Sequence, residues 1–121
     1  MRILDGEQVL ARIFVGEAET WRHVPLYRAL VERLRKAGFA GATVFRGLEG
    51  FGAGSLVHPT HLLDLSSDLP VVIEVVDTEE HIQRLLTILD EMVECGLLVT
   101  VEKVRVVRYG PGTRPKPPAG A

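Results

Sequence analysis

The chain has 121 residues, of which 46% are hydrophobic and 25% charged, and its formal net charge is −2. These values are typical of one soluble globular domain, and the small charge argues against bulk attraction to nucleic acid or to anionic membranes. A single cysteine excludes an intramolecular disulfide. Because no segment has the pattern of a signal peptide or of a membrane span, we expect a cytoplasmic protein with no direct membrane insertion.

The hydrophobic pattern predicts four strands and two helices. The strands show alternating or continuous apolar runs, and the helices have apolar residues three and four positions apart. Pro25 suits the start of a helix, and Gly38 and Gly96 suit helix ends. Asp77 is predicted to cap the second helix. In chain order we expect strand 8–15, helix 25–38, strand 42–48, strand 69–76, helix 77–96 and strand 98–109.

This order predicts an α+β fold of the ferredoxin-like βαββαβ type over residues 1–109. Two right-handed crossovers place both helices on one face of an antiparallel four-stranded sheet. The other sheet face is left bare, and its apolar residues predict a homo-oligomer. Glu74 lies inside an apolar strand and requires a partner, for which Arg12 is the candidate. Residues 110–121 are rich in proline and glycine, which predicts a mobile tail.

A long segment, 50–68, separates the second and third strands. Connections of about 15 residues or more usually have a function or lack a fixed structure. This one combines glycines, hydroxyls and two histidines with apolar side chains. We therefore predict that it is a functional loop whose apolar residues bind or release a partner when a ligand changes the state of the loop.

The glycines of this region allow two interpretations. Gly47, Gly50, Gly52 and Gly54 resemble a phosphate cradle, since backbone amides without shielding side chains can point at oxyanions. No Gly-Lys-Ser/Thr follows, so the pattern is not a Walker loop. The alternative, which such glycines indicate more often, is a bend or bulge.

A second alternative concerns metal binding. His58, His61 and Asp64 are three residues apart in turn, and on a helix they would share a face that could bind a metal. This spacing gives the alternative function, a metal-binding protein or metal-dependent enzyme. The serines lack a nucleophile-elbow motif, so we predict no catalytic residues. Arg105 and Arg108 either reach a phosphate at a subunit edge or form a solvated strand end.

Several segments together carry a family resemblance. They are EQVL (7–10), FVGE (14–17), PLY (25–27), AGATVFRG (40–47), GFG (50–52) and LPVVIEVVD (69–77). Over about residues 5–109 the chain resembles the PII-like proteins of the domain-of-unknown-function 190 family, which is similar to the nitrogen-regulatory PII signalling proteins. Unlike PII proteins, it has Ala53 and Gly54 in place of the arginine and glutamine that follow the GFG motif.

The resemblance implies a non-enzymatic signalling protein that forms a trimer. It also implies an adenine nucleotide bound between subunits, and a T-loop that controls a partner such as a membrane channel or transporter. The ligand-binding residues it implies are Arg46, Gly47, Gly50, Phe51, Gly52, Ala53, Gly54, Ser55, Arg105 and Arg108. The partner-binding residues are Leu56, Val57, His58, His61, Leu62 and Leu63.

Overall fold

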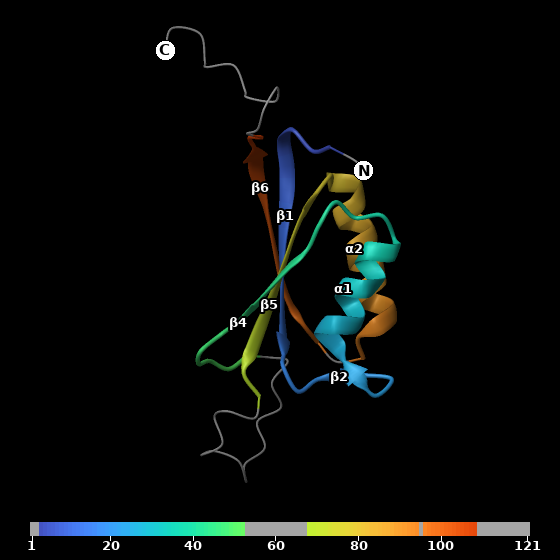
Figure 1. Ribbon diagram of the computed structural model, residues 1–121, viewed down its shortest axis with the longest axis vertical. Helices are drawn as coiled ribbons and strands as arrows, with labels where there is room; N and C mark the ends of the chain where they lie inside the picture. Colours follow the sequence, from blue (N-terminus) through green and yellow to red (C-terminus); the bar gives the residue numbers. More distant parts are fainter. Residues whose placement is uncertain (1–2, 53–67, 95, 109–121) are drawn as a thin grey trace, which may run out of the picture.

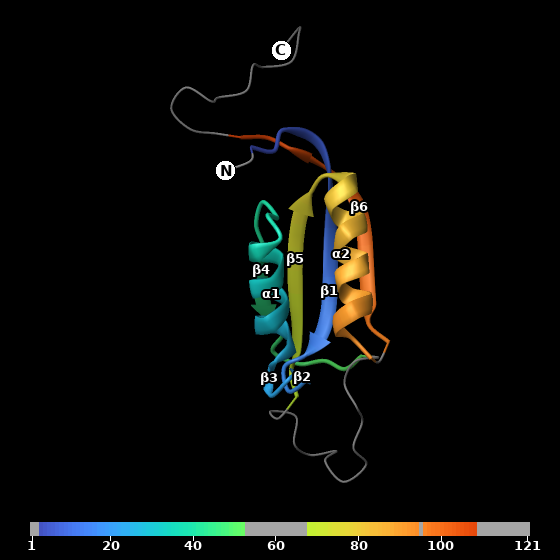
Figure 2. The same cartoon turned by 90° about the vertical axis from the view of Figure 1, so that its right-hand side faces the viewer.

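The computed structural model describes residues 3–52, 68–94 and 96–108. Its main sheet has the strand order β4-β5-β1-β6, and all neighbouring strands are antiparallel. Both helices lie on one face of this sheet (Figures 1 and 2), which confirms the predicted ferredoxin-like architecture. The elements of this layer pair are β1 (Gly6–Gly16), α1 (Leu26–Lys36), β4 (Thr43–Arg46), β5 (Pro70–Asp77), α2 (Glu79–Met92) and β6 (Leu98–Val106).

The hydrophobic core fills the space between the helices and the inner face of the sheet. The inner face of β1 consists of four alternate side chains, Val9, Ala11, Ile13 and Val15, which are almost completely buried. Each buried aliphatic side chain contributes about 1.5–3 kcal/mol relative to exposure. The central members of the core are Val9, Ala11, Ile13, Val15, Val71, Ile73, Val75, Leu26, Leu30, Leu34, Ile82, Leu85, Ile88, Leu89 and Met92.

The start of α2 differs from the prediction. Thr78, and not Asp77, is the N-cap residue, and its hydroxyl accepts a hydrogen bond from the His81 amide at 3.1 Å. Asp77 ends β5 with no exposed surface. Its carboxylate accepts from the Thr78 amide at 2.7 Å. The prediction was wrong by one residue because both side chains suit a cap, and only burial distinguishes them.

The connection between β1 and α1 contains a short hairpin that the sequence pattern does not predict. Strands β2 (Thr20–Trp21) and β3 (Val24–Pro25) pair across a two-residue turn. The turn residues Arg22 and His23 have φ angles of +48° and +71°. Such turns normally carry Asn-Gly or Asp-Gly, so the hairpin has no sequence signal here. It packs beside the start of α1 (Figure 1).

No helix within the described ranges is long and apolar enough to cross a lipid bilayer. The predicted mobile tail, 110–121, lies outside the described residues.

Candidate functional site

The chain leaves β4 and enters β5 at the same end of the sheet. We call the surrounding structure the loop base: residues 16–19 after β1, 46–50 after β4, and 68–70 before β5. The Gly47 amide donates to the Pro70 carbonyl at 2.7 Å, and the Glu17 amide donates to the Leu69 carbonyl at 2.8 Å. The start of β5 is therefore hydrogen-bonded both to the connection after β1 and to the residue that follows β4.

A charged pair also joins two parts of the loop base. The guanidinium of Arg46, at the end of β4, donates to the carboxylate of Glu17. The Arg46 side chain is 63% exposed, whereas that of Glu17 is 26% exposed. The hydrogen bond to Glu17 and its charge raise the pKa of Arg46, and Tyr27 adds to this effect. The Arg46 guanidinium is therefore positioned by Glu17 and still open to solvent, which suits it to bind an anionic ligand.

The glycines of the loop base are required by close packing. A Cβ atom on Gly47 would lie 2.7 Å from Pro70 Cγ, and one on Gly50 would lie 3.1 Å from the same atom. Gly50 also has φ +153°, a conformation that side chains disfavour. This packing supports the bend interpretation for both positions. By contrast, a Cβ on Gly52 would meet no atom within 4 Å.

Two carboxylates flank the end of β1. The Asp68 carboxylate accepts from the Ala18 amide at 3.2 Å, and the Glu19 carboxylate accepts from the Gly16 amide at 3.3 Å. Burial raises the pKa of Glu19, and the charge of Asp68 raises it further, while the bond from Gly16 opposes both effects. A Cβ on Gly16 would lie 2.5 Å from Asp68 Oδ1, so a side chain at this position would displace the Asp68 carboxylate.

The predicted ligand residues lie at two opposite ends of one subunit. Arg46 is in register with Val15 through Val71, whereas Arg105 is opposite Glu7. Val15 and Glu7 are eight residues apart on β1, which corresponds to about 26 Å along an extended strand. A single subunit therefore cannot bring Arg105 and Arg46 to one small ligand. The Arg108 Nε atom is buried and has no hydrogen-bond partner within the described residues.

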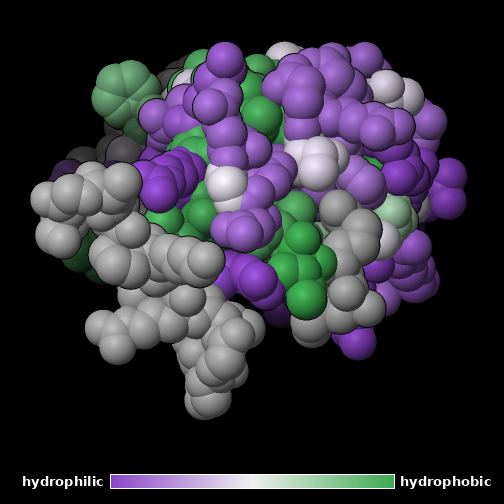
Figure 3. Space-filling model, turned by 90° about the horizontal axis from the view of Figure 1, so that it is seen from above, coloured by the Kyte–Doolittle hydropathy of each residue, from purple (hydrophilic) through white to green (hydrophobic). Residues whose placement is uncertain are grey.

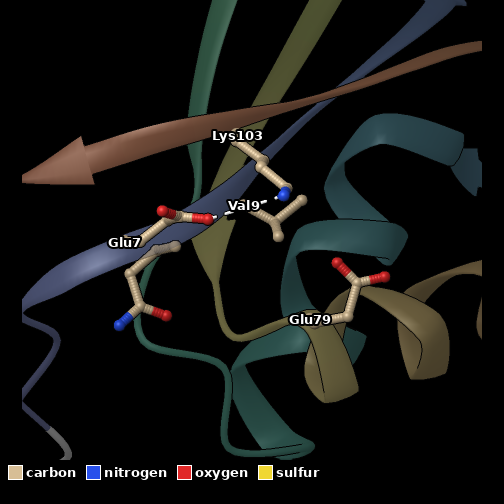
Figure 4. A pocket seen from close by; sticks show the side chains of 5 residues that line it. Glu7, Val9, Glu79 and Lys103 are labelled. Carbon is tan, nitrogen blue, oxygen red and sulfur yellow. Dashed lines mark ion pairs between the residues drawn. The ribbon is translucent and has the colours of Figure 1, made fainter.

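A pocket of about 460 Å³ lies at the Arg105 end of the sheet. Figure 4 shows Lys103 directed toward Glu7, with which it forms an ion pair of 3.6 Å, while Glu79 from the start of α2 faces the same space. Two carboxylates outnumber one ammonium, so this pocket does not favour a phosphate. Seen from this end, mostly hydrophilic side chains surround separate hydrophobic patches (Figure 3).

The sheet face away from the helices, called here the open face, has a charged centre and an apolar row. Arg12 donates to Glu74 at 3.0 Å and to Glu102 at 2.6 Å, which confirms the predicted Arg12–Glu74 pair. Two residues further along β1, at Phe14, directly opposed side chains on the four strands form an apolar row across the sheet. The row consists of Phe45, Val72, Phe14 and Leu98, of which Phe45 and Leu98 are about half exposed.

Leu48 and Phe51 are the most exposed large apolar side chains of the described residues, at 97% and 91%. Both lie at or beside the loop base, where a binding surface for a ligand or partner was predicted. The other predicted loop residues lie outside the described residues. They are Ala53, Gly54, Ser55, Leu56, Val57, His58, His61, Leu62, Leu63 and Asp64.

Nothing supports the metal alternative, because its three ligands are among the undescribed residues and the described ones contain no cluster of three or more metal-ligating side chains. Sequence reasoning missed Glu17, which pairs with Arg46, and Tyr27, which contributes to the raised pKa of Arg46. The only signal in the sequence was their presence in the FVGE and PLY segments, which gives no contact between them.

Comparisons with known proteins agree with this geometry. The sequence model of the DUF190 family, described as "Uncharacterized ACR", matches residues 8–106. A UPF0166 protein of Aquifex aeolicus (strain VF5) is 38% identical over 107 residues, covering 88% of this chain and 98% of the relative. A UPF0166 protein of Methanocaldococcus jannaschii is 30% identical over 99 residues, covering 82% and 91%.

A similar solved structure is that of CPII from Thiomonas intermedia K12 bound to ADP, AMP and acetate. It has a TM-score of 0.60 and 21% identity, and the match covers 88% of this chain and 94% of CPII. Another structure of that protein describes it as a nitrogen regulatory PII-like protein. The fold of this chain is thus PII-like.

Proposed function

The chain belongs to the DUF190 family, and from this premise we propose that it is a non-enzymatic PII-like signalling protein. It assembles as a trimer, binds an adenine nucleotide between subunits, and controls a partner such as a membrane channel or transporter through the 50–68 loop. The observation that carries this proposal is the exposed guanidinium of Arg46 at the loop base of a PII-like fold. CPII, which shares the fold, binds ADP and AMP.

The separation of the predicted ligand residues supports a site between subunits. Arg46 and the loop base lie at one end of β1, and Arg105 and Arg108 lie near the other end. A second copy placed head to tail brings its Arg105 end to the loop base of the first. Head-to-tail contacts of this kind generate closed rings when the rotation closes.

The open face supports assembly on independent grounds. The apolar row of Phe45, Val72, Phe14 and Leu98 lies beside the Arg12 network on the side that the helices do not cover. Because exposed apolar patches of this kind mark interaction surfaces, we assign this face to contacts between copies. An aspartate at Phe45 is expected to weaken the assembly, which size-exclusion chromatography with light scattering measures.

A complementation experiment tests the shared site. Arg46→Gln and Arg108→Gln variants each lack one half of every site, and both are expected to bind ADP weakly in calorimetry. When the two variants are unfolded together and refolded as a mixture, about a quarter of the interfaces regain both arginines, provided that subunits combine at random. Recovery of ADP binding at that fraction supports the proposal.

Two outcomes contradict the proposal. If the wild-type chain binds neither ADP, AMP nor ATP at millimolar concentration, the nucleotide assignment is wrong. If the separate variants lose binding and the mixture never recovers it, the two arginines do not act across an interface. A thermal-shift series with the same nucleotides gives an independent reading, because a ligand that binds only the folded state raises the melting temperature.

A further inference from the structure

The geometry points to Glu17 as a built-in competitor of the anionic ligand: its carboxylate holds the Arg46 guanidinium, and the ligand must take Arg46 from it to bind. This inference rests on the proposed function, because it assumes that Arg46 binds a nucleotide phosphate. Beyond that function, it assigns a role to Glu17 and states how the ligand changes the loop base: Arg46 leaves the Glu17 carboxylate and binds the phosphate.

The starting observation is the ion pair itself. Arg46 donates to Glu17 through a terminal guanidinium nitrogen. Glu17 comes from the connection after β1, whereas Arg46 is the last residue of β4. Their side chains differ in exposure, 26% for Glu17 and 63% for Arg46. The carboxylate is thus the more fixed partner, and the guanidinium is the one with room to move.

The backbone around Glu17 explains why the carboxylate stays in place. The Glu17 amide donates to the Leu69 carbonyl at 2.8 Å, just before β5. The next residue, Ala18, donates to the Asp68 carboxylate at 3.2 Å. Glu17 is therefore anchored to the far end of the long segment, and Arg46 stands next to Gly47 at its near end. The ion pair joins the two ends.

An anion beside Arg46 changes this arrangement in a defined way. A phosphate oxygen offers the guanidinium a second anionic partner, which competes with the Glu17 carboxylate for the N–H donors of Arg46. When Arg46 turns to the phosphate, the link between the near end and Glu17 is lost, while the backbone bonds of Gly47 and Glu17 remain. The ligand thus breaks the ion pair between Arg46 and Glu17 but leaves the backbone hydrogen bonds of the loop base intact.

Removing the charge of Glu17 should therefore strengthen binding. Glu17→Gln keeps the size of the side chain and leaves Arg46 without its competing carboxylate. Because exposed ion pairs are weak, we expect the affinity for ADP to rise by no more than about fivefold. In an Arg46→Gln background the same substitution is expected to have no effect on affinity. The measurement is calorimetric titration of the full chain with ADP at constant ionic strength.

A matched control separates this effect from net charge. Glu91→Gln also removes one negative charge and breaks an exposed pair with an arginine, Arg33, but between the two helices and not at the loop base. It should leave the ADP affinity unchanged. Melting temperatures check that each variant folds. If Glu17→Gln does not fold, Glu17→Asp is the second variant: its side chain is one methylene shorter and reaches less far toward Arg46, so the affinity for ADP should change in the same direction.

The outcomes separate this inference from the proposed function. An affinity gain in Glu17→Gln that disappears with Arg46→Gln supports competition. If Arg46→Gln weakens ADP binding while Glu17→Gln and Glu91→Gln behave alike, the nucleotide site stands and the competition is refuted. If Glu17→Gln weakens binding, Glu17 assists the ligand, and the inference is again refuted. Absence of ADP, AMP and ATP binding in every variant, wild type included, overturns both.

Discussion

The carboxylate of Asp77 accepts a hydrogen bond from the backbone amide of Ala40 at 2.9 Å, which joins the end of β5 to the connection between α1 and β4, 37 residues earlier in the sequence. The same carboxylate accepts from the Thr78 amide at 2.7 Å. His81 lies 3.6 Å from it and packs edge-on against Phe39. One buried side chain therefore fixes the chain between α1 and β4 onto the start of α2.

Replacement of Asp77 is expected to be costly. Asp77→Ala removes the acceptor of two part-buried hydrogen bonds, from the Ala40 and Thr78 amides, so the free energy of unfolding should fall by about 1–3 kcal/mol. Asp77→Asn, which keeps one acceptor oxygen, should cost less. Denaturant unfolding measures both. Asp90→Ala, at an exposed position of α2, is the control and should change the stability by less than about 0.5 kcal/mol. Equal effects of Asp77→Ala and Asp90→Ala would contradict this role.

The β2–β3 turn predicts a gain in stability. His23 has φ +71° without being glycine, which costs roughly 1 kcal/mol. His23→Gly should therefore raise the stability by up to about 1 kcal/mol, or the melting temperature by up to about 4 °C for a domain of this size. The neighbouring Arg22 is less suitable for this test, because its guanidinium lies 4.4 Å from the centre of the Trp21 ring.

His23→Ala is the control for this turn, since it removes the imidazole without relieving the backbone. It should not stabilise the protein. A melting temperature that rises equally in both variants would assign the effect to the lost side chain, and the backbone argument would then be wrong.

The raised pKa of Glu19 predicts a dependence of stability on pH. A carboxyl whose pKa is higher in the folded than in the unfolded state stabilises the fold when the pH is below its ordinary pKa, near 4.5. This contribution is lost as the pH rises through the folded pKa. Glu19→Gln removes the titration and keeps an acceptor for the Gly16 amide. The variant should therefore gain stability relative to the wild type between pH 4 and pH 7, as thermal unfolding measures.

The sign of that difference is the test. If the advantage of Glu19→Gln were the same at pH 4 and pH 7, or fell as the pH rose, Glu19 would not have a raised pKa in the folded state. Glu91→Gln, at a surface position between the helices, provides the comparison for a general change in net charge.

The contact between Gly47 and Pro70 predicts a local packing defect. A methyl group at Gly47 would lie 2.7 Å from Pro70 Cγ and 3.2 Å from the Pro70 carbonyl oxygen. Because the carbonyl belongs to the backbone, it cannot move aside freely, and Gly47→Ala should lower the stability by about 1–3 kcal/mol. Gly52→Ala, which meets open space, is the matched control. Equal stability of the two variants would refute the close approach.

The sequence predicted the elements that follow from hydrophobic periodicity. The inner face of β1, the two helices and the strand order all follow from residue patterns that burial enforces. Arg12 was identified as the partner of Glu74 because a half-buried carboxylate needs a cation. Glu102 was not, since it lies 90 residues along the chain from Arg12 and only the β1–β6 register brings it near.

The missed features depend on contacts that have no local pattern. Arg22 and His23 adopt left-handed angles that their residue types do not favour, so neither predicts a turn. The pairing of Glu17 with Arg46 joins the connection after β1 to the end of β4, on the other side of β5, and no spacing rule relates the two residues. Within the site, the sequence indicated the glycines and arginines of the loop base. It did not indicate that Arg105 lies at the opposite end.

The strand order also has a consequence for how the chain is made. β1 is the first strand of the sequence, yet it lies inside the sheet, and its second neighbour is β6, the last strand described. Gly6 pairs with Val106. During synthesis one edge of β1 therefore stays unpaired until residues 98–106 leave the ribosome, and the sheet closes late. A chain truncated before Leu98 should expose that edge and aggregate rather than fold.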